Sequence, residues 1–155
     1  MGNYVTIDIG GTNIKYGLID DQETLVEAHE IPTEAQKGGP EIMRKVQKIV
    51  ADYVQAGAIE GICISSAGMV DPDKGEIFYA GPQIPNYAGT QFKKVLEEEF
   101  SIPCEIENDV NCAGLAEVMS GHGKGAKIAV CLTIGTGIGG CLVADGQVFH
   151  GFSNS

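Results

Sequence analysis

Two short segments that combine glycine with threonine are the part of the chain best suited to binding a phosphate. The first is Gly10-Gly11-Thr12 and the second is Gly135-Thr136-Gly137, and each follows an apolar, strand-like run. Glycine has no side chain, so backbone N–H groups can approach a phosphate closely, and a threonine hydroxyl can add a hydrogen bond or contact a hydrated metal ion. Two such segments predict a nucleotide held between two related halves of a protein.

Neither segment matches the common nucleotide-binding loops. A P-loop would place a lysine directly after its last glycine, and a Rossmann fingerprint would be followed by a helix. Here Tyr4–Ile9 and Lys15–Ile19 are strand-like runs on either side of the first glycines, which predicts a β-hairpin. Both segments could be ordinary hairpin turns, although four glycines between positions 135 and 140 exceed what chain reversal needs.

Asp8 and Lys15 flank the first glycine turn. Asp8 lies near the end of the first strand, where its carboxylate could face a hydrated Mg²⁺ on the nucleotide phosphates. The alternative is an ion pair with Lys15 across the hairpin. Lys15 could reach the same phosphates or simply be solvated. The second glycine turn favours the phosphate interpretation for both residues.

Asn108-Asp109 follows a predicted strand and begins a predicted helix. Either residue could be an ordinary helix N-cap. The functional alternative makes Asp109 a general base, because a sugar hydroxyl that attacks the terminal phosphoryl group of ATP must lose a proton. Asn108 could then bind adjacent sugar hydroxyls. Gly68, at the end of Ser65-Ser66-Ala67-Gly68, could bring backbone atoms close to a ligand or serve only as a turn residue.

Helices and strands alternate along the chain, which predicts an α/β fold. The apolar stripe from Ile42 to Val54 recurs at helical spacing, and Pro40 and Gly57 suit the two ends of that helix. The other predicted elements are helices at Thr90–Phe100 and from Asp109 to about Met119, strands at Ile59–Ser65, Cys104–Glu107, Ile128–Ile134 and Gly140–Ala144, and a final hairpin to Phe149.

Length and composition allow one ordinary hydrophobic core. The chain has 155 residues, of which 43% are hydrophobic. The segment after Ala113 holds only one helix and a strand pair, which is less than the roughly 50 residues of a small domain. We therefore interpret residues 1–112 as one lobe and residues 113–155 as the beginning of a second.

The charge balance narrows the class of partner. Lys and Arg number 10 and Asp and Glu number 21, which gives a net charge of -11 at pH 7. This excess of negative charge disfavours nucleic acid and anionic membranes, whereas ATP can still be bound by backbone amides, local lysines and a divalent cation. Neither a leader peptide nor a membrane-spanning run is apparent, so a cytoplasmic location is expected.

The cysteines show no metal-binding pattern. Each lies singly in an apolar context, without a C-x-x-C pair or a histidine at a spacing suited to zinc. We therefore expect reduced thiols in the core at Cys63, Cys104, Cys112, Cys131 and Cys141.

Three motifs together resemble the ROK family of bacterial sugar kinases and sugar-sensing repressors. They are Asp8-Ile9-Gly10-Gly11-Thr12-Asn13-Ile14-Lys15, Glu107-Asn108-Asp109-Val110-Asn111-Cys112-Ala113 and Ile134-Gly135-Thr136-Gly137-Ile138-Gly139-Gly140. The resemblance spans the whole chain in the right order. It implies an actin-like ATPase (ribonuclease H-like) fold whose two lobes close over Mg-ATP and a sugar, with this chain as one lobe plus the start of the second.

The resemblance also implies roles for individual positions. Asp8, Gly10, Gly11, Thr12 and Lys15 would form a first phosphate region, with Asp8 contacting Mg²⁺ through water, and Thr133, Gly135, Thr136 and Gly137 would form a second. Asp109 would be the catalytic base, and Asn108, Asp109 and Gly68 would contact the sugar. The family's Ser-x-Pro-Gly pattern has Ala67 in place of proline here, so the segment that ends at Gly68 departs from the family at this position.

The leading interpretation is the N-terminal half of an ATP-dependent hexose or β-glucoside kinase, acting on a small-molecule sugar. We expect the 155-residue piece alone to be inactive, since the family's Gly-Glu-x-Gly-His stretch would follow it. One alternative is a sugar-sensing ROK-type regulator, which would need a helix-turn-helix ahead of this sequence. Another is a nucleotide- or sugar-binding fragment without turnover. A half-formed second lobe would expose the apolar face of its strands, which predicts a homodimer or low stability.

Overall fold

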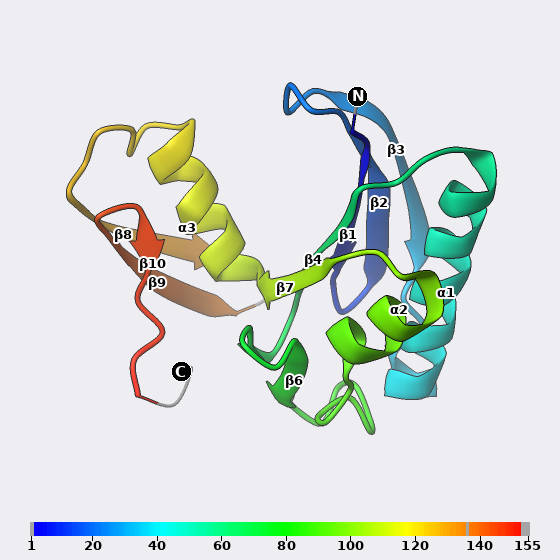
Figure 1. Cartoon of the computed structure of the whole chain (residues 1–155). Coiled ribbons are helices and arrows are strands. Elements are labelled where there is room, and N and C mark those ends of the chain that lie inside the picture. The colour runs from blue at the N-terminus through cyan, green and yellow to red at the C-terminus, as the bar shows by residue number, and fades with distance from the viewer. Residues whose placement is uncertain (1, 136, 153–155) are drawn as a thin grey trace. The chain divides into compact units, whose positions relative to one another are not determined.

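The computed structural model describes residues 2–135 and 137–152 and divides into two units, Met1–Glu107 and Asn108–Ser155 (Figure 1). The division falls at the start of the helix that begins at Asp109. The interpretation of residues 1–112 and 113–155 as two lobes stays a prediction.

A five-stranded sheet forms the centre of the first unit. Its strands lie in the order β3-β2-β1-β4-β7, with β1 antiparallel to β2 and parallel to β4. Their bounds are β1 (Tyr4–Ile9), β2 (Asn13–Ile19), β3 (Leu25–Pro32), β4 (Gly61–Ser66) and β7 (Cys104–Asn108). The predicted hairpin is confirmed, and so are the strands expected near β4 and β7.

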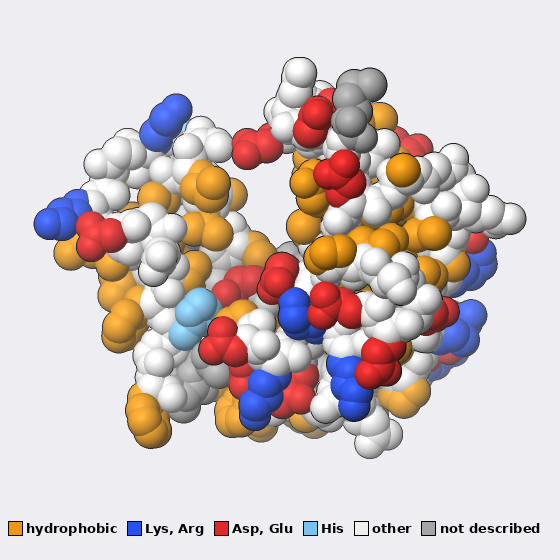
Figure 2. Space-filling model, viewed as in Figure 1, with side chains coloured by type: hydrophobic (Ala, Val, Ile, Leu, Met, Phe, Trp, Pro, Cys, Tyr) orange, Lys and Arg blue, Asp and Glu red, His pale blue; other side chains and the backbone are white. Residues whose placement is uncertain are grey.

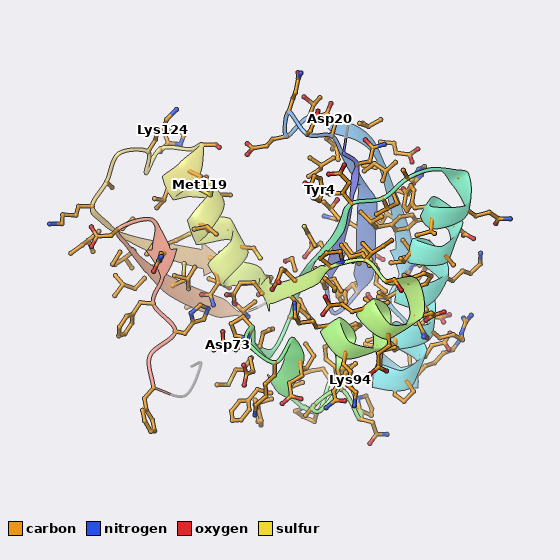
Figure 3. All side chains as sticks on the ribbon, in the orientation of Figure 1. Tyr4, Asp20, Asp73, Lys94, Met119 and Lys124 are labelled. Atoms are coloured by element: carbon orange, nitrogen blue, oxygen red, sulfur yellow. The ribbon has the colours of Figure 1, made fainter. Side chains whose placement is uncertain are left out.

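Strand β3 has no counterpart among the predicted elements. It pairs with β2 at the edge of the sheet, and most of its side chains are exposed. A strand that buries neither face has no reason to alternate apolar and polar residues, so its sequence lacks the usual period of two. Asp20 begins the turn before β3, and it lies near Tyr4 at the opposite end of the hairpin from Gly10 (Figure 3).

Helix α1 (Gly39–Ala56) covers one face of the sheet (Figure 1). Its buried stripe packs in the same core as the alternate residues of β1 and β4. The predicted stripe and both helix ends are therefore confirmed. Helix α2 (Phe92–Phe100) begins two residues later than Thr90 and buries Phe92 and Leu96. A single turn of 3₁₀ helix, η1 (Ala35–Lys37), precedes α1.

The opposite face of the sheet is polar. Because side chains alternate along a strand, Asp8, Cys63 and Glu105 lie on the face away from the core, and all three are exposed.

All five cysteines are free thiols. The expectation that all lie in the core is wrong for Cys63, since its odd position on β4 points it away from α1. Cys104 and Cys141 are buried, while Cys112 and Cys131 are partly exposed.

A small hairpin of β5 (Met69–Asp71) and β6 (Glu76–Tyr79) follows β4. The turn between them ends at Gly75, which has a φ of 69°. The Gly10 turn after β1 and the β5–β6 hairpin after β4 thus both follow the carboxyl ends of neighbouring parallel strands.

The second unit contains helix α3 (Asp109–Met119) on a three-stranded sheet of order β10-β9-β8. The strands are β8 (Ile128–Ile134), β9 (Ile138–Ala144) and β10 (Gln147–Val148). The predicted bounds of β8 are confirmed, and β9 begins two residues before the predicted Gly140. Asp145 and Gly146, with φ of 50° and 77°, form the predicted tight turn. Gly114 lets α3 approach closely, because a Cβ there would lie 2.1 Å from Cys141 Sγ.

The face of this sheet away from α3 is apolar and exposed. Val130, Leu132 and Ile134 keep 70%, 66% and 82% of their surface accessible. The expected exposed apolar face is therefore present. On the side of the molecule drawn in Figure 2, Lys and Arg side chains lie among Asp and Glu without forming an extended basic area.

Candidate functional site

The first glycine turn joins β1 to β2 and has its own set of hydrogen bonds. The Gly10 amide donates to the Asn13 carbonyl at 3.0 Å. Thr33 donates from Oγ1 to the Gly10 carbonyl at 2.7 Å and from its amide to the Thr12 carbonyl at 2.8 Å. Within the described residues the Gly11 and Thr12 amides donate no hydrogen bond, and a Cβ at Gly11 would meet nothing within 4 Å. The turn therefore offers two N–H groups and open space to an anion.

Asp8 is exposed beside this turn and accepts a hydrogen bond from Ser65 Oγ at 2.9 Å. Asp8 and Lys15 lie opposite each other in the strand register, but no ion pair joins them in the described part of the chain. The alternative interpretation of Asp8 as a partner of Lys15 is therefore wrong. An exposed carboxylate oriented by one hydroxyl suits a water-mediated contact with Mg²⁺, a cation that prefers oxygen ligands and retains several waters.

Gly68 follows β4 in a turn that is fixed from two sides. Ser66 is fully buried, and its hydroxyl lies 2.6 Å from Tyr87 Oη, while the Ala67 amide donates to the Ile9 carbonyl at 3.0 Å. Gly68 itself has a φ of 93°, and a Cβ there would lie 2.9 Å from the Tyr79 carbonyl oxygen. The backbone conformation alone thus requires glycine. Its contact with a sugar stays a prediction.

Asn108 is the N-cap of α3. Its side-chain oxygen accepts hydrogen bonds from the amides of Val110 at 2.9 Å and Asn111 at 3.2 Å. The ordinary capping role is therefore confirmed for Asn108. Asp109 is the first residue of the helix, is partly buried, and accepts from the Val110 amide at 2.9 Å. The helix N-terminus stabilises a carboxylate at this position. A role for Asp109 as a base is compatible with this position and stays a prediction.

The second glycine turn joins β8 to β9, and its glycines serve two purposes. Gly135 and Gly137 are exposed, a Cβ on either would meet nothing within 4 Å, and the Gly135 amide donates to the Gly137 carbonyl at 2.9 Å. At Gly139 a Cβ would lie 2.5 Å from Val110 Cγ2 and 2.9 Å from Thr133 Oγ1. Packing therefore demands Gly139, whereas no such contact in the described part of the chain demands Gly135 or Gly137. Thr136 lies outside the described residues.

The structure assembles the predicted residues into two groups, one in each unit. In the first unit, Asp8, Lys15 and the Gly10–Thr12 turn share one end of the hairpin. In the second unit, the close approach of Val110 to Gly139 places the start of α3 beside β9 and β8, and β8 carries Thr133 and ends directly before Gly135. The sequence interpretation named the Ser65-Ser66-Ala67-Gly68 segment but missed the contact of Ser65 with Asp8, and it missed Thr33. Thr33 belongs to none of the motifs, so no local signal identified it.

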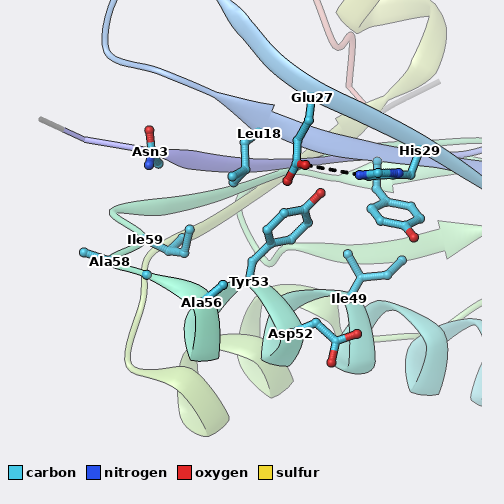
Figure 4. A pocket seen from close by; sticks show the side chains of 12 residues that line it. Asn3, Leu18, Glu27, His29, Ile49, Asp52, Tyr53, Ala56, Ala58 and Ile59 are labelled. Carbon is cyan, nitrogen blue, oxygen red and sulfur yellow. Dashed lines mark hydrogen bonds and ion pairs between the residues drawn. The ribbon is translucent and has the colours of Figure 1, made fainter.

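A pocket of about 360 Å³ lies within the first unit, between α1 and the β2–β3 edge of the sheet (Figure 4). Tyr16, Tyr53, Glu27 and His29 line it, and His29 Nε2 lies 3.3 Å from Glu27 Oε2. Burial raises the pKa of the Tyr53 hydroxyl to about 12, and the nearby Glu27 carboxylate adds to this effect. None of the predicted site residues contributes to this pocket.

No group of three or more His, Cys, Asp or Glu side chains in residues 2–135 and 137–152 is arranged to hold a metal ion. A magnesium ion near Asp8 would therefore take most of its ligands from water and a nucleotide. Among the described helices, none has the length and apolar character needed to cross a bilayer.

Comparison with known proteins identifies relatives along the whole chain. The model of the ROK family matches residues 4–154. An uncharacterized protein of Clostridium perfringens is 57% identical over 155 residues, which cover 100% of this chain and 52% of that protein. A glucokinase of Halalkalibacterium halodurans is 35% identical, covering 96% and 46%. A beta-glucoside kinase of Listeria monocytogenes is 36% identical, covering 93% and 47%. The chain thus spans about half the length of these relatives.

Solved structures give the same result. A ROK family glucokinase from Streptomyces griseus, in complex with glucose and AMPPNP, has a TM-score of 0.82 at 28% identity and is matched over 97% of this chain and 47% of its own. A ROK hexokinase from Thermus thermophilus has a TM-score of 0.78 at 30% identity, and the match covers 98% of this chain and 50% of the hexokinase. A ROK family transcriptional regulator shares the fold, with a TM-score of 0.83 at 18% identity over 96% and 38%.

These neighbours confirm the predicted fold, because ROK sugar kinases have the actin-like ATPase fold. The family match covers nearly the whole chain and includes both glycine turns and the start of α3. The chain therefore belongs to the ROK family.

Proposed function

We propose that the protein containing this chain is an ATP-dependent sugar kinase that transfers the terminal phosphoryl group of ATP to a hydroxyl of a hexose or β-glucoside. The observation that carries the proposal is the first glycine turn, where two unpaired amides lie beside an exposed carboxylate. Relatives named glucokinase and beta-glucoside kinase support the same reaction.

In the first unit, the Gly11 and Thr12 amides are proposed to bind phosphate oxygens, with Gly10 keeping the turn tight. The Thr12 hydroxyl and Lys15 add further donors. Asp8, oriented by Ser65, is proposed to hold a water of the magnesium ion. When bound, Mg-ATP would supply the phosphoryl group, and its magnesium ion would partly neutralise the negative charge of the phosphates.

In the second unit, Thr133, Gly135, Thr136 and Gly137 are proposed to bind the nucleotide phosphates. Asp109 is proposed to accept the proton of the attacking sugar hydroxyl. The sugar oxygen then forms a bond to the terminal phosphorus, and the bond between that phosphorus and the ADP oxygen breaks. Asn108 and Gly68 are proposed to orient the sugar through an amide and a backbone group. We also propose that the protein is a homodimer.

The test is ADP release by the full-length protein with a panel of sugars that includes glucose, N-acetylglucosamine and a β-glucoside. We expect ADP release that requires both sugar and Mg²⁺ and stops when EDTA is added. The 155-residue chain alone is expected to show none. Sugar binding in calorimetry without any ADP release would contradict the proposal and favour a sugar-sensing regulator or a non-catalytic binding protein.

A further inference from the structure

Thr33 follows strand β3 and is fully buried. Both of its hydrogen-bond donors reach the first glycine turn, 23 residues earlier in the chain: Oγ1 binds the Gly10 carbonyl at 2.7 Å and the amide binds the Thr12 carbonyl at 2.8 Å. Within the described residues, no other side chain donates to a carbonyl of this turn. Thr33 is thus the residue that connects the turn to the rest of the first unit.

The direction of the turn's amides follows from these two bonds. The Gly10 carbonyl and the Gly11 amide belong to the same planar peptide group and point in opposite directions. A bond from Thr33 to the carbonyl therefore fixes the Gly11 N–H on the side away from Thr33. The hydrogen bond from the Thr33 amide to the Thr12 carbonyl fixes the next peptide group but one, which joins Thr12 to Asn13. Glycine alone would leave this segment free to adopt many conformations.

Lys45 of helix α1 binds the backbone on either side of the Pro32–Thr33 bond and so fixes the position of Thr33. Its amino group donates to the Pro32 carbonyl at 2.7 Å and the Thr33 carbonyl at 3.1 Å, and it contacts Glu34 Oε2 at 3.1 Å. The Lys45 side chain is only 11% exposed. The end of β3 is therefore tied to the helix that covers the core, and the glycine turn is tied to the end of β3.

We propose that Thr33 is a positioning residue for nucleotide binding: its hydroxyl and amide hold the first glycine turn so that the Gly11 N–H faces the phosphate. Lys45 supports Thr33 from α1. This inference rests on the proposed function, since it assigns the turn to a nucleotide. A purely structural role for Thr33 would change stability without a selective change in nucleotide affinity.

The test compares three variants of the full-length protein. Thr33→Val keeps the shape and the amide but removes the hydroxyl donor, and Thr33→Ser keeps the hydroxyl. Thr24→Val is the matched control, because Thr24 lies in the turn at the other end of the hairpin. We expect Thr33→Val to raise the KM for ATP and the Kd for AMPPNP by about tenfold, as for loss of one hydrogen bond, while the KM for sugar changes less than about twofold. Thr33→Ser and Thr24→Val should stay close to the wild type.

Each outcome gives a decision, provided thermal melting shows that the variants are folded at the assay temperature. Thr33→Val with the wild-type affinity for AMPPNP overturns the inference alone. Equal weakening of ATP and sugar binding also overturns it, since that is the result of a structural defect. A wild-type protein that binds AMPPNP but releases no ADP rejects the proposed reaction, and the affinity ratio still decides the role of Thr33. A wild-type protein that binds no nucleotide overturns both.

Discussion

The two glycine turns have similar sequences but are supported differently. The first turn is held by Thr33 and Asn13 in a unit whose five-stranded sheet packs on a helix. For the second turn, the described residues show one backbone bond, from Gly135 to Gly137, in a three-stranded sheet with an exposed apolar face. A glycine-rich sequence thus specifies an open loop, and contacts from distant residues such as Thr33 hold that loop in one conformation.

The glycines themselves differ in the same way. At Gly11, Gly135 and Gly137 a Cβ would meet no neighbouring atom within 4 Å, so packing does not explain these glycines. The space that they leave open is available to a ligand. At Gly114 and Gly139 a Cβ would collide with neighbouring side chains, so their role is to let α3 approach the sheet. Four sets of substitutions, ordered by expected effect, test how the second unit differs from the first.

The largest effect is expected for Asp109→Asn, which removes the proposed base and keeps the shape of the side chain. In the full-length protein kcat should fall by at least about 100-fold, while the melting temperature changes little. Asp145→Asn, in the exposed turn after β9, is the control. A loss of less than tenfold in kcat would show that Asp109 serves only the helix terminus, and the second unit would then supply only binding groups.

Gly139→Ala should destabilise the second unit by about 1–3 kcal/mol, because the new methyl group would overlap Val110 Cγ2 and Thr133 Oγ1. Gly135→Ala has open space around it and should leave the free energy of unfolding within about 0.5 kcal/mol of the wild type while weakening ATP binding. Urea denaturation and the KM for ATP measure the two effects. Equal destabilisation by both variants would remove the distinction between packing and binding glycines.

Leu132→Lys tests the exposed face of β8, of which Leu132 retains 66% of its surface. We expect the 155-residue chain to self-associate through this face, and the charged side chain to weaken that association by about tenfold or more, as for loss of one buried leucine. Sedimentation velocity over a range of concentrations measures it. Glu117→Gln, on the exposed surface of α3, is a control with the same change in net charge. A monodisperse, stable wild-type monomer would contradict this prediction.

The smallest effect is expected for the N-cap of α3. Asn108→Ala should lower stability by about 1 kcal/mol, because the amides of Val110 and Asn111 lose their acceptor. Asn108→Asp keeps an oxygen acceptor at the cap, now as a carboxylate, but loses the amide donor proposed for the sugar. It should preserve the melting temperature and raise the KM for sugar. Parallel changes in stability and in sugar KM for the two variants would assign Asn108 to capping alone.

Much of the fold could be predicted because the relevant signals are local. The helical spacing of Ile42, Val46 and Ile49 in α1 and the glycines between β1 and β2 act over a few residues, and the structure confirms both. Strand β3 could not be predicted, since an edge strand with exposed faces has no alternating pattern. The exposure of Cys63 could not be predicted either, because an apolar run such as β4 does not indicate which face of the strand is covered by a helix.

Residue types at short, fixed spacing were enough to predict the family, the hairpin around the first glycine turn and a helix cap at Asn108 or Asp109. The folded chain was needed to show that Ser65 rather than Lys15 binds Asp8, and that Thr33 holds the glycine turn. These partners are 57 and 23 residues apart in the chain. Sheet order and strand register bring them together, and those depend on how the whole unit buries its apolar side chains.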